Sequence, residues 1–218
     1  MLATPEVAHY AERTKSSWDR YCRRHGYGFY VTDRKLVHDM HINWTKIEMM
    51  RRHLRRSEAD WVVLVDADTH VVRQEVTLEN IANRYPGKTL LFAWDGVRRF
   101  GMPLAVNRRG RRLCGVRNVP NAGFIVVRNS PLGRTFFDDW LSLARGRYRH
   151  LADIHPRNQN VLWAGLFAQY RECIAVLGGK VARIGTSRIL DAISLNRDDA
   201  FVLHDKRLHQ QRPADLSD

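Results

Sequence analysis

Two aspartates, Asp66 and Asp68, directly follow an apolar run in the segment WVVLVDADTHVV, residues 61–72. The run is rich in β-branched residues, as in strands that are buried on both faces of a parallel sheet. On an extended chain the two carboxylates point to the same side, and like charges so close disfavour each other's ionisation. No lysine or arginine lies in the segment. The pattern therefore predicts a hard divalent cation, Mn²⁺ or Mg²⁺, between them, with a solvated turn capped by Asp66 as the alternative.

A histidine and two lysines extend this candidate site. His204 ends the apolar run FVLH, so its imidazole is expected at the carboxyl edge of a strand, where open α/β sheets bind ligands. Two carboxylates and an imidazole suit Mn²⁺ and leave positions for diphosphate oxygens, which Lys206 would help to neutralise. Lys46 lies in the first turn of a predicted helix, an unfavourable place for a cation, so it should pair with an aspartate or reach a phosphate. The plainer interpretations are a structural histidine and surface lysines.

Amide side chains form a third group. In PNAGFIVVRNSP, Asn121-Ala122-Gly123 precede a predicted strand at 124–127, and a glycine there lets backbone approach a ligand. In RNQN, residues 157–160, Asn158 and Gln159 open a predicted helix, where N–H groups and the helix dipole favour negative charge. Both groups are expected to face a polar or anionic ligand.

The chain of 218 residues is basic, with 36 Lys+Arg against 23 Asp+Glu. No carboxylate lies between residues 96 and 137, a stretch that holds nine arginines. This stretch fits a polyanion, nucleic acid first, or a solvated surface. No apolar run approaches the roughly 20 residues that span a bilayer. Three scattered cysteines (Cys22, Cys114 and Cys173) favour free thiols, and hence a cytoplasmic protein.

Apolar periodicity predicts alternating helices and strands. Helices are expected near 5–25, 43–57, 78–84, 131–143 and 157–170, and strands near 27–32, 61–65, 89–94, 124–127, 181–184 and 201–203. The segment around Gly101, Pro103 and Gly110 is expected to be a loop. The alternation favours an α/β fold with one mostly parallel central sheet and flanking helices. We expect one domain over residues 1–210 and a flexible tail at 211–218. No glycine-rich phosphate loop is present, which again favours a metal.

In this order the motifs resemble the GT-A glycosyltransferases, and among them the retaining family of α-galactosyl, α-xylosyl and yeast α-mannosyl transferases. The resemblance runs from about residue 10 to 205. It rests on W-x-K-I at 44–47, DAD at 66–68, NAGFIVVRNS at 121–130, Gln159 and the late His204. It implies a Rossmann-like GT-A domain that uses a nucleoside diphosphate sugar and a divalent metal.

The resemblance also implies roles for the matching residues. Asp68 is similar to the family's principal metal ligand, Asp66 to a residue that touches ribose and metal, and His204 to a late metal-binding histidine. Gln159 would face the anomeric carbon, and Asp95, in FAWDG, would line the sugar pocket. The expected donor-binding residues are Thr4, Lys46, Asp66, Asp95, Asn121 and Lys206, and the expected catalytic residues are Asn158 and Gln159.

Three departures modify these expectations. Family members usually carry an acid immediately before the glutamine, and Asn158 in its place excludes a double displacement through that position. A front-face mechanism remains, in which an amide oxygen stabilises the oxocarbenium-like state. The first strand, which normally helps to hold the base, is reduced to residues 1–4, so either base recognition is altered or the true start lies upstream. The absence of an anchor and of a lumenal cysteine pattern favours a bacterial or phage cytoplasmic enzyme.

We therefore expect a metal-dependent glycosyltransferase that moves a sugar from a UDP-sugar to an acceptor hydroxyl, with retention of configuration. The arginine-rich stretch 98–117 falls where GT-A enzymes carry acceptor loops, so hydroxymethylated DNA is the first acceptor considered, with Trp94 and Phe100 near an extruded base. A cell-surface glycan or lipid-linked sugar is the alternative. Two other classes remain: a nucleotidyltransferase, which would not need Asn121 or Gln159, and a non-catalytic nucleic-acid-binding protein.

Overall fold

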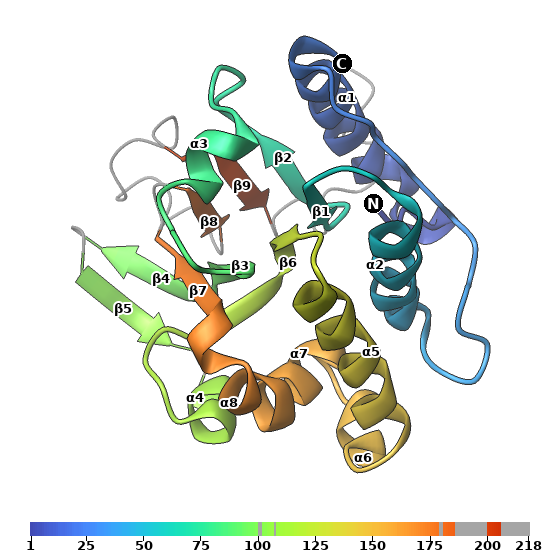
Figure 1. Ribbon diagram of the computed structural model, residues 1–218, viewed down its shortest axis with the longest axis vertical. Coiled ribbons are helices and arrows are strands. Elements are labelled where there is room, and N and C mark those ends of the chain that lie inside the picture. The colour runs from blue at the N-terminus through green and yellow to red at the C-terminus, as the bar shows by residue number, and fades with distance from the viewer. Residues whose placement is uncertain (100–101, 107, 179–180, 186–199, 206–218) are drawn as a thin grey trace.

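A computed structural model describes residues 1–99, 102–106, 108–178, 181–185 and 200–205, and Figure 1 shows its arrangement. A central sheet has the strand order β1-β6-β3-β7, and a smaller sheet beside it has the order β2-β9-β8. The central strands are β1 (Trp61–Val65), β6 (Pro120–Arg128), β3 (Leu90–Trp94) and β7 (Ile174–Leu177). The others are β2 (Thr69–Val71), β9 (Val202–Asp205), β8 (Ala182–Gly185) and a hairpin of β4 (Gly96–Arg99) and β5 (Met102–Val106).

Alternate residues of the central strands enter two separate hydrophobic clusters. Leu64, Phe92 and Ile125 lie in the cluster on one face of the sheet. Val65 and Phe124 lie in the cluster on the other face. Because side chains alternate along a strand, a run that is apolar at every position buries both faces. The structure therefore confirms the prediction that the apolar runs lie inside an α/β fold.

Helices and the small sheet cover these two faces. The first cluster packs under α2 (Thr45–Arg56), α5 (Pro131–Arg145) and the continuous helical segment α7 (Asn158–Val161), η3 (Leu162–Leu166, a π-helix) and α8 (Phe167–Gln169). The second packs under α1 (Ala8–His25), α3 (Leu78–Ala82), β2 and β9. The remaining helices are α4 (Arg108–Cys114), α6 (Arg149–Ala152), and the short η1 (Pro5–Val7), η2 (Ile42–Trp44) and η4 (Arg171–Cys173). In the described ranges, every helix is too short or too polar to cross a bilayer.

The sheet is mixed, which corrects the expectation of a mostly parallel sheet. β6 runs antiparallel to both of its neighbours, β1 and β3, and β3 is parallel to β7. An apolar run reports that a strand is buried on both faces, but burial does not fix the strand's direction. The α/β class is confirmed, and the direction of β6 was beyond what periodicity encodes.

Three local predictions were also wrong. Asn121-Ala122-Gly123 belong to β6, which begins at Pro120, rather than preceding it. The predicted loop around Gly110 contains the β4–β5 hairpin and helix α4. The predicted strand at 27–32 is reduced to a bridge between Leu2 and Thr32 in the described residues.

The predicted tail 211–218 lies outside the described residues. The three cysteines are free thiols, as expected.

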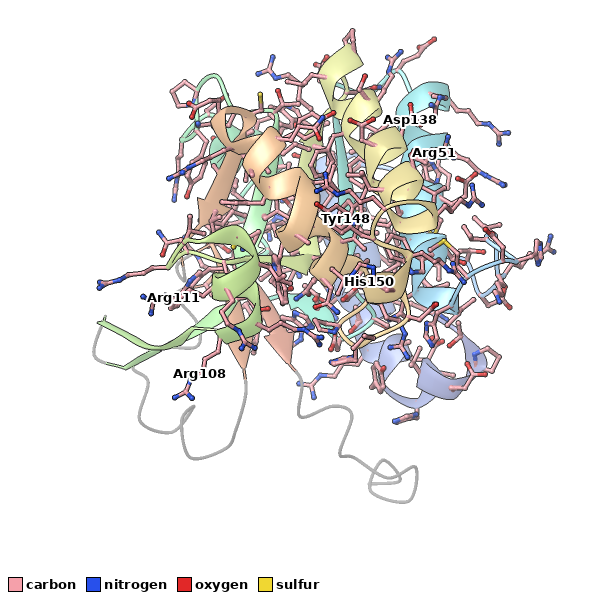
Figure 2. All side chains as sticks on the ribbon, turned by 90° about the horizontal axis from the view of Figure 1, so that it is seen from below. Arg51, Arg108, Arg111, Asp138, Tyr148 and His150 are labelled. Carbon is pink, nitrogen blue, oxygen red and sulfur yellow. The ribbon has the colours of Figure 1, made fainter. Side chains whose placement is uncertain are left out.

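An ion-pair cluster joins α2 to α5, and Figure 2 shows Arg51 and Asp138 on these facing helices. Arg51 Nε lies 2.7 Å from Asp138 Oδ1, and Arg55 Nη2 lies 2.5 Å from Asp138 Oδ2. Partial burial raises the pKa of Asp138, but hydrogen bonds from Arg55 and Arg51 outweigh it and hold that pKa below its usual value.

We expect Asp138→Asn to lower the free energy of unfolding at pH 7 by about 0.5–1 kcal/mol, because the partners are partly exposed. A carboxylate with a lowered folded-state pKa stabilises the fold above its unfolded pKa of about 3.9, and this contribution is lost as the pH falls through the folded-state pKa. Urea denaturation at pH 7 and at pH 2.5 measures this difference. A deficit that is equally large at low pH would contradict the ionic origin.

Candidate active site

The turn after β1 brings Asp68 beside His204. Asp66 N–H donates to Gly123 O at 2.8 Å, and Thr69 N–H donates back to Asp66 O at 3.0 Å, so the chain reverses within the DAD motif. β2 then starts at Thr69 and pairs antiparallel with β9, with Thr69 opposite His204. Ligand atoms of Asp66, Asp68 and His204 consequently lie within 4.8 Å of one another. The structure thus assembles the three residues that the sequence proposed as metal ligands.

Each aspartate of this group has a basic partner. Lys46 Nζ lies 2.5 Å from Asp66 Oδ1, and His204 Nε2 lies 2.9 Å from Asp68 Oδ1. Asp68 and His204 are only 5% and 6% exposed. Lys46, on the first turn of α2, is buried as well, and its pairing with an aspartate is one of the two roles predicted for it. Asp66 is therefore paired with a lysine from α2, and Asp68 contacts an imidazole from β9.

The donor set fits a divalent cation. Two carboxylates and one imidazole match the oxygen and nitrogen ligands of Mn²⁺ and Mg²⁺ sites. His204 Nδ1 is buried and has no hydrogen-bond partner among the described residues. Within the described residues the imidazole therefore keeps one nitrogen without a hydrogen-bond partner, while the other contacts Asp68.

Gly123 provides the space for His204. A Cβ atom at Gly123 would lie 2.5 Å from His204 Cε1 and 2.6 Å from Nδ1, closer than real Cβ contacts. The sequence analysis expected this glycine to admit a ligand, whereas the structure shows the imidazole against it. Asn121 Oδ1 accepts a hydrogen bond from Gly123 N–H at 2.7 Å and is itself buried, so it shapes this end of β6.

Gln159 and Asp95 meet beside the same β6 segment. Gln159 Nε2 donates to Asp95 Oδ2 at 3.0 Å, and Gln159 Oε1 accepts from Ala122 N–H at 3.2 Å. The carboxamide is thus held at both ends, and its orientation is fixed by a carboxylate from the end of β3. Gln159 contacts β6 at Ala122, and His204 packs against the next residue, Gly123, so the two groups meet β6 at adjacent positions. The hydrogen bond between Asp95 and Gln159 was not predicted.

Asn158 is a buried neighbour of Gln159. Its Oδ1 accepts from Gln159 N–H at 3.0 Å, and its backbone oxygen accepts from Trp140 Nε1 at 3.0 Å. Its Nδ2 has no hydrogen-bond partner among the described residues. Arg157, directly before it, has φ 34°, a conformation that costs of order 1–3 kcal/mol for a non-glycine residue. Such backbone strain is often found at functional sites, which supports Asn158 and Gln159, at the start of this helix, as candidate site residues.

Tyr10 is a further candidate residue near the aspartates, and it was not predicted from the sequence. It is buried on α1, and burial raises the pKa of its hydroxyl, with Asp68 and Asp66 as further causes. The phenol therefore stays protonated and able to donate a hydrogen bond near the two carboxylates. Tyr10 is spaced four residues from Thr14 and eight from Trp18 on the buried face of α1, so helical periodicity was the available signal.

Two predicted donor residues are not joined to this group. The Thr4 oxygen accepts from Val7 N–H at 3.1 Å and its side chain bonds Glu6, both on the turn of η1. The described contacts of Thr4 include none of the site residues above. Lys206 lies outside the described residues. The site roles of both stay predictions.

The first part of the chain matches a known family. The model of the galactosyl transferase GMA12/MNN10 family, glycosyltransferase family 34, matches residues 3–83, a segment that includes Lys46, Asp66 and Asp68. No curated protein sequence matches the chain significantly.

Solved structures match nearly the whole chain. A glycosyltransferase involved in glycosylation of the major capsid of PBCV-1 is 15% identical with a TM-score of 0.68, covering 98% of this chain and 93% of that one. GlyE of Streptococcus pneumoniae TIGR4 is 14% identical with a TM-score of 0.55, covering 93% of this chain and 53% of its own. The galactosyltransferase LgtC, in complex with donor and acceptor sugar analogs, is 11% identical with a TM-score of 0.50, covering 92% and 82%.

The chain therefore has the GT-A glycosyltransferase fold. At these identities the structures define the fold, and the family match over residues 3–83 adds support for a glycosyltransferase enzyme. The resemblance inferred from the motifs is confirmed at this level.

Proposed function

We propose that this protein is a metal-dependent glycosyltransferase that transfers a sugar from a nucleoside diphosphate sugar, a UDP-sugar in the first instance, to an acceptor hydroxyl. The observation that carries the proposal is the meeting of Asp66, Asp68 and His204 within 4.8 Å, beside the β6 segment that also holds Gln159 and Asp95. The GT-A fold of LgtC, solved with donor and acceptor sugar analogs, supports the same chemistry.

In this proposal Asp66, Asp68 and His204 hold Mn²⁺ or Mg²⁺. The ion, when bound, supplies Lewis-acid stabilisation of a departing diphosphate, an effect of several kcal/mol. Lys46 turns from the Asp66 carboxylate to a diphosphate oxygen, the second role that the sequence predicted for it. Tyr10, kept protonated, would be a further hydrogen-bond donor near the two aspartates.

Gln159 and Asp95 act on the sugar in this proposal. The amide of Gln159 is fixed by Asp95 and by Ala122 N–H, so little reorganisation is needed when positive charge develops at the anomeric carbon. Asp95 contributes a negative charge that stabilises this oxocarbenium-like state. Asn158 helps to hold Gln159 in place, because its Oδ1 accepts a hydrogen bond from the Gln159 backbone N–H. A front-face mechanism with retention is consistent with an amide rather than a carboxylate at residue 158.

An anionic acceptor is supported by the surface around α4. Arg108, Arg111, Arg112 and Arg117 are exposed and make no ion pair among the described residues. Figure 2 shows Arg108 and Arg111 directed away from the body of the protein. Arg109 Nη1 donates to His155 O at 3.1 Å, which ties α4 to the segment before Gln159. The capsid-glycosylating fold relative and the arginines together favour a polyanionic or glycan acceptor, and the DNA acceptor stays a sequence-based prediction.

The test is a donor screen. Purified protein is melted with UDP, GDP and dTDP, each with Mn²⁺ or with EDTA, and then assayed for hydrolysis and transfer with the matching sugars. A nucleotide at one hundred times its dissociation constant should stabilise the fold by about 2.7 kcal/mol. A shift with one nucleotide that requires Mn²⁺ supports the proposal. If a folded protein shows no shift with any nucleotide, the proposal fails.

Gln159→Ala is expected to lower kcat for sugar transfer about 10- to 100-fold, because it removes the oriented amide from the charge-developing centre. Nucleotide affinity should change less than threefold, since the metal ligands are untouched. The matched control is Gln169→Ala, whose amide contacts Asp139 on the surface. Steady-state kinetics and nucleotide titration separate the two effects. An unchanged kcat for sugar transfer in Gln159→Ala would contradict the role proposed for its amide.

A further inference from the structure

A second candidate site lies away from the DAD turn, between α1 and β2. A cavity of about 450 Å³ opens there, lined by Arg13, Ser16, Ser17, Arg20, His70, Val71, Val72 and Gln74. None of the residues assigned to the donor site lines it. Its volume falls within the range of small-molecule pockets, about 300–1,000 Å³. Figure 1 shows α1 lying alongside β2 at this position.

The walls of the cavity are fixed by hydrogen bonds beneath it. Trp18 Nε1 donates to Thr69 O at 2.6 Å, and Tyr21 Oη donates to Val76 O at 2.8 Å. Ser17 Oγ donates to Val71 O at 3.0 Å and accepts from Val71 N–H at 2.9 Å. Because these bonds hold α1 against the β2 segment, the hollow above them is a built feature and does not depend on a ligand to form.

The helical wall carries a polar, positively charged stripe. Residues 13, 16, 17 and 20 are spaced i, i+3, i+4 and i+7, so they share one face of α1, with Arg13 and Arg20 two turns apart. In the described part of the chain neither arginine makes an ion pair, because Glu12 pairs with Lys15 and Asp19 with Arg23. The stripe therefore presents two uncompensated guanidinium groups to a concave surface.

The opposite wall adds further polar groups. His70 belongs to β2, and Gln74 anchors its Nε2 on Ser17 O at 3.4 Å. Gln74 Oε1 is buried and has no hydrogen-bond partner among the described residues. It could accept a hydrogen bond from a hydroxyl of a ligand. Ser16 offers an exposed hydroxyl donor. Among the described residues, no carboxylate lines the cavity.

We propose that this cavity binds the phosphate group of a phosphate ester, held between Arg13 and Arg20, with the ester's hydroxyl-bearing part toward Gln74. Guanidinium groups form bidentate, charge-assisted hydrogen bonds with phosphate oxygens. A pair of arginines is therefore better suited to bind a phosphate than a pair of lysines would be. One wall of the cavity is β2. Its first residue, Thr69, follows Asp68 and pairs with His204, so the backbone of β2 connects the second site to the donor site.

The experiment titrates ¹⁵N-labelled protein with inorganic phosphate in EDTA, so that no metal-dependent donor binding contributes. Saturable shifts of the amides of Ser16, Ser17 and His70 are expected. The double variant Arg13→Gln/Arg20→Gln should weaken phosphate at least tenfold. Arg24→Gln/Arg84→Gln, which removes two exposed charges outside the cavity, should bind within twofold of wild type. Absence of saturable shifts, or equal weakening in both double variants, would overturn the proposal.

Variants of Ser16 test the site further, and two other ligands distinguish the source of the phosphate group. Ser16→Asp places a negative charge in the cavity and should abolish phosphate shifts, whereas Ser16→Ala should change affinity less than threefold. Glucose 1-phosphate that binds more tightly than inorganic phosphate identifies a soluble ester. Binding to vesicles of phosphatidylcholine with phosphatidic acid, lost in Arg13→Gln/Arg20→Gln, identifies a lipid headgroup. Equal phosphate affinity in Ser16→Asp and wild type would contradict the site.

Discussion

Asp68→Asn is expected to abolish metal-dependent nucleotide binding and to lower sugar transfer at least about 1,000-fold, equivalent to about 4 kcal/mol in the barrier. Asp68 is 5% exposed, so water cannot readily replace its carboxylate as a ligand. The asparagine has the same shape and keeps an oxygen that can accept from His204 Nε2, which now lies 2.9 Å from Asp68 Oδ1. Loss of the charge, rather than loss of the fold, is therefore what this variant tests.

The measurement is the melting shift caused by UDP with Mn²⁺, together with transfer kinetics. Wild type should be stabilised by about 2.7 kcal/mol at a hundred times the dissociation constant, and Asp68→Asn should show no Mn²⁺-dependent shift. Asp138→Asn is the matched control, because it removes one carboxylate from the α2–α5 surface and leaves the site intact. A retained Mn²⁺-dependent shift in Asp68→Asn would mean that the Asp68 carboxylate is not needed to hold the metal.

Local sequence signals identified the candidate ligands but not how they come together. Asp66 and Asp68 follow one apolar run and His204 ends another, which marked all three as residues near strand ends. Their meeting within 4.8 Å depends on the turn after β1 and on the pairing of β2 with β9, a strand of the smaller sheet. The direction of β6 likewise depends on long-range pairing with β1 and β3, which an apolar run does not encode.

Contacts between side chains from distant segments were harder to anticipate. The hydrogen bond from Gln159 to Asp95 joins residues 64 positions apart, and Tyr10 approaches Asp68 from a helix that periodicity alone marks as core. Lys46 was the exception, because a lysine in the first turn of a helix is electrostatically unfavourable and so needs a partner. Its contact with Asp66 Oδ1 at 2.5 Å supplies that partner. Local anomalies thus indicated contacts that patterns of hydrophobicity did not.

Gly123→Ala is expected to lower the free energy of unfolding by about 1–3 kcal/mol and to weaken Mn²⁺ about 10- to 100-fold. The new Cβ would lie 2.5 Å from His204 Cε1 and 2.6 Å from Nδ1, and the ring, 6% exposed on a paired strand, has little room to retreat. Gly178→Ala is the control, because no atom of the described residues beyond its chain neighbours lies within 4 Å of its Cβ position. Its change should stay within about 0.5 kcal/mol.

A double-mutant cycle identifies the imidazole as the cause. In a His204→Ala background the closest contact is removed, so Gly123→Ala should cost at least about 1 kcal/mol less than in wild type, as urea denaturation measures it. A small cost should remain, because Asn121 Oδ1 would still lie 2.9 Å from the new Cβ. Equal costs in both backgrounds would mean that Gly123 is needed by the backbone of β6. Coupling would instead show that this glycine exists to seat His204 against the aspartates.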